Sequence, residues 1–135
     1  MLGKFLVAWA ASVPEVAARI AGRIRPQHRH AHDLRDCLVY VLTSSSRIRS
    51  LSGETPTFRE RYTLICYADR QADADTLGEE IRAGLDGYAG SLAGVEVLNA
   101  QVAEASDDED VEADGLPPKP RRTLTLAIWY RAASP

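Results

Sequence analysis

The sequence contains few of the residues from which disulfide frameworks and reactive sites are most often built. Its 135 residues include two cysteines, three histidines and one methionine. Cys37 and Cys66 both lie in apolar, strand-like runs, where two cysteines are more often small buried core residues than a disulfide or a pair of metal ligands. We therefore expect two buried free thiols in a protein of a reducing compartment.

Long hydrophobic runs are also missing. No apolar run reaches the ~18–20 residues needed to span a bilayer, so no membrane segment is expected. The N-terminal stretch MLGKFLVAWAASVPEVA has the lysine, apolar run and small residues of a signal peptide, but Pro14-Glu15 and the continuing pattern at Val16 and Ile20 favour a helix of the mature protein. With 45% hydrophobic and 26% charged residues, residues 1–135 are expected to form a single globular domain.

The motifs of common catalytic sites are absent. The chain has no G-x-G-x-x-G or G-x-x-x-x-G-K-[ST] loop for phosphates, no G-x-S-x-G turn and no H-E-x-x-H metal motif. The acidic run near the C-terminus lacks the D-x-[DN]-x-[DN]-G-x₅-E spacing of a calcium loop, and we interpret it as a solvated segment. We therefore expect a protein that is not an enzyme and that has no cofactor and no metal.

The stretch QHRHAHDLRD is the one exception that could hold a metal. It contains all the histidines of the chain, at alternate positions: His28, His30 and His32. In a strand these side chains would share one face, and catalytic zinc commonly has three protein ligands. Arg25, Arg29 and Arg35 flank them, however, and nearby cations disfavour Zn²⁺ binding. An exposed polar loop is therefore favoured over a metal-dependent enzyme.

Hydrophobic periodicity predicts elements in the order α-β-β-α-β-β. Helices are expected at 2–21 and 72–88, and strands at 37–43, 59–67, about 94–104 and 121–131. Pro14 should bend or split the first helix, with Ser12 as a candidate cap for the second part. This order indicates an α+β domain with one antiparallel four-stranded sheet and two helices packed mainly on one face. The expected core residues are Tyr62, Leu64, Leu77, Ile81, Leu85, Leu124, Leu126 and Ile128.

Two long connections carry charges of opposite sign. SSSRIRSLSGETPTF joins the first two strands, and SDDEDVEADGLPPKP precedes the last one, giving an acidic, proline-rich loop expected at about 104–120. Residues 1–70 have 11 Lys/Arg and 6 Asp/Glu (+5), whereas residues 71–135 have 5 and 13 (−8). This asymmetry suggests head-to-tail association or a polarised surface, although a scattered solvated surface explains it equally well.

Both connections are candidate interaction surfaces. The basic connection could contact the phosphate backbone of a nucleic acid or an acidic surface of a partner protein. Sequence-specific recognition of bases is not expected. The candidate assembly interface consists of Arg47, Ile48, Arg49, Leu51, Phe58, Arg59 and Arg61. The candidate acidic surface, for lining a lumen or for docking, consists of Asp107, Asp108, Glu109, Asp110, Glu112 and Asp114.

The succession of these segments resembles the tail terminator, or tail completion, proteins of long-tailed bacteriophages. The resemblance is carried by AGRIRP at 21–26, CLVYVLTSSSRIRSLSGET at 37–55, FRERYTLICYA at 58–68, DADTLGEEIRAGLDGY at 73–88 and RRTLTLAIWYR at 121–131. The resemblance covers nearly the whole chain. It rests on the pattern and order of these segments and not on catalytic residues. The acidic segment is longer than the family pattern, so the resemblance assigns it no role.

The resemblance implies a structural virion protein of the tail-neck region, assembled in the host bacterial cytoplasm. Such proteins form a hexameric ring at the head-proximal end of the tail tube, stop tube polymerisation and present a surface to the head-side connector or stopper. DNA passes through the lumen without sequence-specific binding. The alternative is a host α+β module that binds a small molecule or acts in regulation.

Overall fold

The computed structural model describes residues 2–26, 36–48, 57–109 and 120–132. Their order of helices and strands confirms the α+β class. The elements are α1 (Gly3–Ser12), α2 (Pro14–Ile20), β1 (Ile24–Pro26), β2 (Cys37–Ile48), β3 (Thr57–Tyr67), α3 (Gln71–Leu85), β4 (Gly90–Leu92), β5 (Val95–Glu109) and β6 (Pro120–Ala132).

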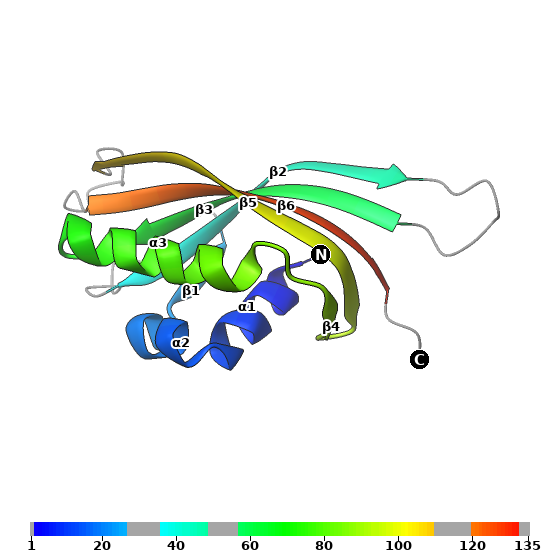
Figure 1. Ribbon diagram of the computed structural model, residues 1–135, viewed down its shortest axis with the longest axis horizontal. Coiled ribbons are helices and arrows are strands. Elements are labelled where there is room, and N and C mark those ends of the chain that lie inside the picture. The colour runs from blue at the N-terminus through cyan, green and yellow to red at the C-terminus, as the bar shows by residue number, and fades with distance from the viewer. Residues whose placement is uncertain (1, 27–35, 49–56, 110–119, 133–135) are drawn as a thin grey trace.

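The strands form one curved sheet in the order β1-β2-β3-β6-β5-β4 (Figure 1). The four expected strands are its antiparallel centre. The expected four-stranded antiparallel sheet is nevertheless wrong in detail, because β1 joins one edge in parallel with β2 and β4 joins the other edge. Each of these edge strands has only three residues, which is too short for an alternating pattern to be recognised.

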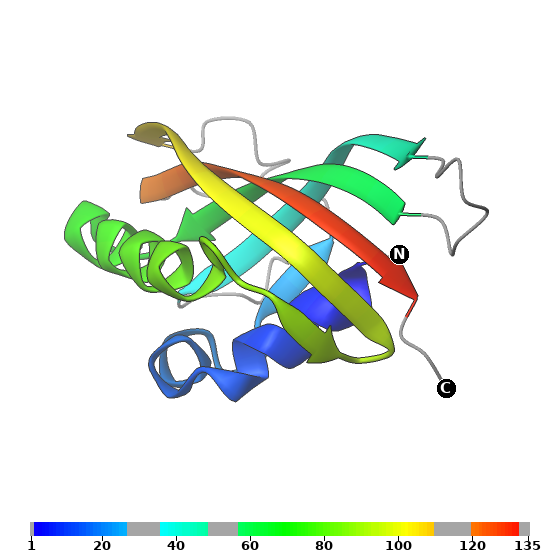
Figure 2. The same ribbon diagram turned by 45° about the vertical axis from the view of Figure 1, so that its right-hand side comes forward.

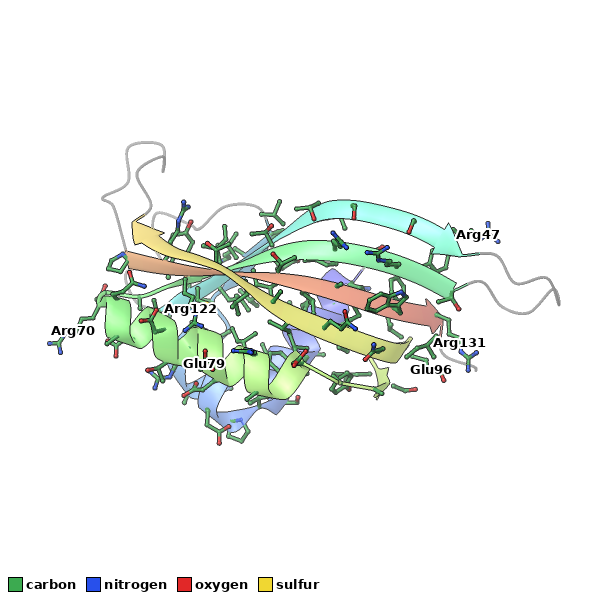
Figure 3. All side chains as sticks on the ribbon, turned by 45° about the horizontal axis from the view of Figure 1, so that its top comes forward. Arg47, Arg70, Glu79, Glu96, Arg122 and Arg131 are labelled. Carbon is green, nitrogen blue, oxygen red and sulfur yellow. The ribbon has the colours of Figure 1, made fainter. Side chains whose placement is uncertain are left out.

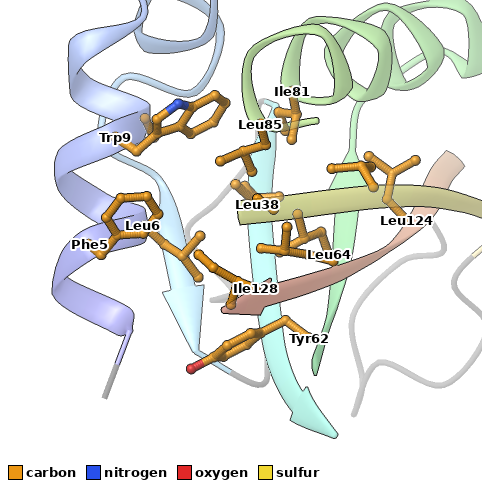
Figure 4. Packing of buried hydrophobic residues seen from close by; sticks show 14 of the residues in the cluster. Phe5, Leu6, Trp9, Leu38, Tyr62, Leu64, Ile81, Leu85, Leu124 and Ile128 are labelled. Atoms are coloured by element: carbon orange, nitrogen blue, oxygen red, sulfur yellow. The ribbon is translucent and has the colours of Figure 1, made fainter. Parts of the chain in front are cut away.

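All three helices lie on one face of the sheet (Figures 1 and 2). We call this the helix-covered face and the other, on which no described helix lies, the open face. The eight expected core residues all point to the helix-covered face and are at most 2% exposed, which confirms that prediction. Side chains from α1, including Phe5, Leu6 and Trp9, complete the same cluster (Figure 4).

The N-terminal helix is divided at Pro14, as expected, and Pro14 begins α2, a position that requires no backbone N–H donor. The proposed cap at Ser12 is wrong. Its hydroxyl donates instead to the Trp9 carbonyl oxygen at 2.7 Å, and Val13 precedes α2 without a side-chain cap. The break lets both short helices follow the curved sheet, and Val16 and Ile20 of α2 are buried beside α1.

The acidic segment is only partly a loop. The backbone of β5 remains paired with β6 as far as Glu109, and β6 begins at Pro120, so the expectation that SDDEDVEADGLPPKP contains no strand is wrong for residues 106–109 and for Pro120. The register sets Asp107 opposite Arg122 and Asp108 opposite Arg121. The backbone register therefore carries the strand into the acidic run.

Gly84 marks a close approach between α3 and α1. A Cβ built at this position would lie 2.6 Å from Cζ2 of Trp9. We expect Gly84→Val to lower the free energy of unfolding by about 1–3 kcal/mol, because the indole must leave its buried site. Ala83→Val, at the exposed neighbouring position, is the matched control. Urea denaturation measures both, and equal stability of the two variants would contradict this packing.

Candidate functional site

The two long hairpins project from opposite ends of the sheet (Figure 1). The hairpin between β2 and β3 leaves the sheet at Ile48 and Thr57, and that between β5 and β6 leaves it at Glu109 and Pro120. β3 pairs with β6 along nearly its whole length, from Phe58 opposite Tyr130 to Tyr67 opposite Arg121. The arginine-rich end and the acidic end of the chain are therefore separated by the full length of the sheet.

Arg59 and Arg61 occupy the open face near the arginine-rich end. The register places Arg59 opposite Trp129 and Arg61 opposite Ala127. The Arg59 guanidinium lies 5.5 Å from the centre of the Trp129 ring, a cation–π distance, whereas Arg61 is exposed. We call the surface formed by Arg59, Arg61, Ala127 and Trp129 the basic platform.

Arg47 and Phe58 belong to the other face. They pair across β2 and β3, and the Phe58 ring stacks on Tyr130 with centroids 5.6 Å apart. Phe58, a member of the candidate assembly interface, is thus partly buried against the core. Arg47 is exposed at the end of β2 (Figure 3). The Ile48 side chain, Arg49 and Leu51 lie outside the described residues.

A buried carboxylate fixes the base of the arginine hairpin. Glu60 is 4% exposed and accepts 2.6 Å hydrogen bonds from the hydroxyls of Tyr62 and Tyr130, plus a longer one of 3.4 Å from Ser45. Burial, together with the adjacent Glu60, raises the pKa of both tyrosines above the ordinary value. Both phenols therefore remain hydrogen-bond donors. The hydrogen bonds of Glu60 connect β2, β3 and β6 next to Arg59 and Arg61, on the opposite face of the sheet.

Glu60 was not among the residues predicted from the sequence, although a signal was present. Glu60 occupies an inward-facing position of the alternating strand 57–67, between Phe58 and Tyr62. An acid at such a position needs buried donors. The two tyrosines that supply them lie on two different strands, and single-strand periodicity does not reveal which residues face each other across strands.

Ion pairs satisfy acids elsewhere on the surface. Arg122 of β6 passes over Gly78 and donates to Glu79 of α3 at 2.7 Å, an interaction that lowers the pKa of this carboxyl (Figure 3). Arg131 pairs with Glu96 at 2.9 Å on the open face. Within the described ranges, by contrast, no carboxylate pairs with Arg47, Arg59 or Arg61. Among the described residues of this end, these three arginines therefore carry positive charge that no carboxylate pairs.

Cys37 and Cys66 are buried free thiols, as expected. Burial raises the pKa of Cys66 from 9.0 to about 12, against the opposing effect of Arg122. Above pH ~9 the unfolded chain releases a proton that the folded chain retains, so the free energy of unfolding falls by up to about 1.4 kcal/mol per pH unit for this group. Urea denaturation between pH 8 and roughly 11 should show a smaller slope in Cys66→Ala. An unchanged slope would contradict the assignment.

Neither a metal centre nor a membrane helix is found in the part of the chain that the structure describes. No three His, Cys, Asp or Glu side chains of these residues are grouped so that they could hold a metal ion, and none of the helices has the length and apolar character needed to cross a membrane. The histidines at 28, 30 and 32 lie outside the described residues. The remaining candidate surfaces are therefore the basic platform and the hollows beside α1.

Two hollows lie beside α1, and the wider one includes Lys4 and Tyr40 in its lining. One groove of about 270 Å³ lies between α1, α2 and β1 and is lined only by apolar side chains and Gly22. Small-molecule sites usually combine an apolar lining with a few polar groups that orient the ligand, and no polar side chain lines this groove. When the chain is compared with known proteins, no protein-family model matches it, and neither does any curated protein.

Proposed function

We propose that this chain is a structural virion protein, a tail terminator that forms a ring at the head-proximal end of a phage tail. In this role it ends tail-tube polymerisation, binds the head-side connector or stopper and leaves a lumen through which DNA passes. The number of six copies follows from the resemblance of the sequence to that family. No catalytic residue, cofactor or metal is part of the proposal.

The observation that carries the proposal is the polarity of the sheet. One end bears Arg47, Arg59 and Arg61 without described acidic partners, and the acidic run begins at the other end. A sheet with a basic end and an acidic end favours head-to-tail contacts between copies. Such contacts close into a ring when the rotation between neighbours is suitable. Strands β2 and β3, which extend beyond the helices at one end of the sheet (Figure 2), suit contacts with neighbouring chains.

The alternative is a small-molecule or regulatory binding module, favoured only by the apolar groove beside α1. Its lining of small side chains, such as Ala10, Ala11 and Ala17, offers no group to orient a ligand. The genes next to the coding sequence discriminate the two functions. Capsid, connector and tail-tube genes favour the tail terminator, whereas metabolic or regulatory genes favour the binding module.

Disrupting the gene in the phage or prophage that encodes the chain tests the proposal. Electron microscopy of the lysate should show tails of uncontrolled length that fail to join filled heads, and infectivity should fall by several orders of magnitude. The wild-type chain supplied from a plasmid should restore both. Tails of normal length attached to heads in the disrupted strain would contradict the proposed function.

A further inference from the structure

We propose that copies of this chain join edge to edge, with the free part of β2 in one copy paired antiparallel to the free part of β5 in the next. The inference rests on the proposed function in that it names the surfaces through which the ring closes. It is carried by two exposed strand edges, by the directions in which the two strands run, and by their position at one level of the sheet.

The outer edge of β2 is open over most of its length. β1 pairs only with residues 38–40, whereas β2 continues to Ile48. Among the described residues, none pairs with this edge beyond Tyr40, and every residue from Leu42 to Arg47 is exposed. This part of β2 lies along one side of the sheet, away from the helices (Figure 2). We call residues 41–48 the β2 edge.

The outer edge of β5 is open in the same way. β4 pairs only with residues 95–97, and no other described strand reaches this side of β5. We call residues 98–103 the β5 edge, and its exposed members are Leu98, Asn99, Gln101 and Ala103. An exposed strand edge is a template for pairing with another strand.

Neither edge is well protected against such pairing. Very short strands, prolines and lysines protect the edges of most sheets, and here they protect β1 and β4, which have three residues each. The β2 edge has one charged residue, Arg47, and the β5 edge has none. Each edge also has a bulge, which is a further protection, but the bulge lies near the start of the edge. Regular pairing with the inner strand resumes at 44–48 and at 99–104.

Exposed apolar side chains accompany both edges. Leu42 is 48% exposed and Leu98 is 38% exposed. Strand pairing along the two edges covers part of each side chain, so apolar burial adds to the backbone hydrogen bonds of the contact.

The directions of the strands permit a contact that repeats. β2, β3, β6 and β5 are successive antiparallel neighbours, so β2 and β5 run in opposite directions at the two sides of the sheet. A second copy placed beside the first in the same orientation therefore presents its β2 antiparallel to β5 of the first. Each copy uses both edges, and such a heterologous contact repeats until the ring closes.

The two edges also lie at the same level of the sheet. Val41 of β2 faces Thr63 of β3, which in turn faces Thr125 of β6. Ala103 of β5 completes this row. Because β4 occupies the outer side of β5 as far as Val97, the incoming β2 pairs beyond that residue. It is thereby displaced in the direction that brings the arginine-rich end of one copy toward the acidic end of the next.

Two other pairings use the same edges. The β2 edges of two copies can pair with each other, but this isologous contact ends at two copies and leaves the β5 edge without a partner. An extended segment of another protein can also add to either edge. Only the pairing of β2 with β5 uses both edges of every copy, and the other two pairings are outcomes that the test must detect.

Charges placed on the open face of the two edges test the pairing. Ser44 and Ser46 lie on this face of β2, and Gln101 and Ala103 lie on it in β5. When the sheet continues from one copy to the next, the four positions share one face. Opposite charges on adjacent strands of one face stabilise their pairing, and like charges destabilise it.

Analytical ultracentrifugation should show that the wild type self-associates. Ser44→Glu/Ser46→Glu/Gln101→Lys/Ala103→Lys should associate at least about tenfold more tightly than Ser44→Glu/Ser46→Glu/Gln101→Glu/Ala103→Glu, because attractive pairs replace repulsive ones. Added salt should narrow this difference. The control for net charge is a variant with four glutamates at exposed positions of α2 and α3, which should associate like the wild type: Ala18→Glu/Ala72→Glu/Thr76→Glu/Ala83→Glu.

Hydrogen exchange shows whether the backbones pair. In the associated wild type, the slowest-exchanging amides gained by residues 41–48 and 98–103 should exchange at least about tenfold more slowly than in a dilute, monomeric sample. The variant with glutamates on both edges should keep the faster, monomeric rates. Urea denaturation of each variant confirms that the fold is retained.

Several outcomes would overturn the inference. They are a wild type that stays monomeric at every concentration, equal association of the two edge variants, and protection of the β2 edge alone, which indicates the isologous pair. Because these measurements are made without tails, they separate the two proposals. Edge pairing in a protein whose gene disruption leaves tails normal would support the pairing and refute the proposed function. A monomeric chain whose loss produces overlong tails would do the reverse.

Discussion

Replacing Leu126 with aspartate is expected to unfold the domain. Leu126 is fully buried at the centre of β6, opposite Tyr62 of β3 and Val102 of β5. The substitution removes a core leucine, which costs about 2–5 kcal/mol, and places a carboxylate without donors beneath the helices, which costs several kcal/mol more. The sum approaches the total stability of an ordinary domain, about 5–15 kcal/mol.

Thr125→Asp is the matched control. Thr125 is the neighbouring residue on the open face, between Thr63 and Ala103, where an added carboxylate stays in contact with water. We expect it to change the free energy of unfolding by less than about 1 kcal/mol. Circular dichroism during urea denaturation measures both variants. A soluble Leu126→Asp protein that unfolds cooperatively near the wild-type midpoint would show that the two faces of the sheet have been exchanged.

Removing the buried carboxylate at Glu60 is expected to have the second largest effect. Glu60→Leu leaves the hydroxyls of Tyr62 and Tyr130 without their 2.6 Å acceptor. Each buried donor left unpaired costs about 1–3 kcal/mol, partly offset because the carboxylate no longer has to be desolvated. We expect a net loss of about 2–4 kcal/mol in the free energy of unfolding and a less firmly held arginine hairpin.

A compensating variant separates hydrogen bonding from shape. Glu60→Leu/Tyr62→Phe/Tyr130→Phe removes the two donors together with their acceptor, so it should recover most of the stability lost in Glu60→Leu. Urea denaturation of the wild type, the single variant and the triple variant gives the comparison. If Glu60→Leu is as stable as the wild type, or the triple variant is no more stable than Glu60→Leu, the cluster does not stabilise the hairpin as described.

The core face was predictable because long strands keep a period of two. Leu124, Leu126 and Ile128 alternate with Thr123, Thr125 and Ala127, and both rows lie where the pattern puts them. The edge strands β1 and β4 were not predictable, since three residues carry no period. The extension of β5 through Asp107 and Asp108 follows the register with β6, which the sequence of one strand alone does not show.

The candidate site was predictable in its charges but not in its geometry. A shift in the β2–β3 register between Leu42 and Ser44 changes the face that later residues of β2 occupy. It places Arg47 on the helix-covered side with Phe58, away from Arg59 and Arg61, although all three arginines seemed to form one patch in the sequence. The contact of Arg59 with Trp129 joins residues seventy positions apart, and no local pattern indicates it.

Electron cryomicroscopy of the intact particle would show directly whether this chain forms the neck ring. We expect a ring of six copies at the junction of the tail tube and the head-side connector, with each arginine-rich sheet end against the acidic end of the next copy. The helices and the long hairpins should be recognisable in the density. A particle with a complete neck that lacks this chain, or a ring of this chain anywhere else in the particle, would contradict it.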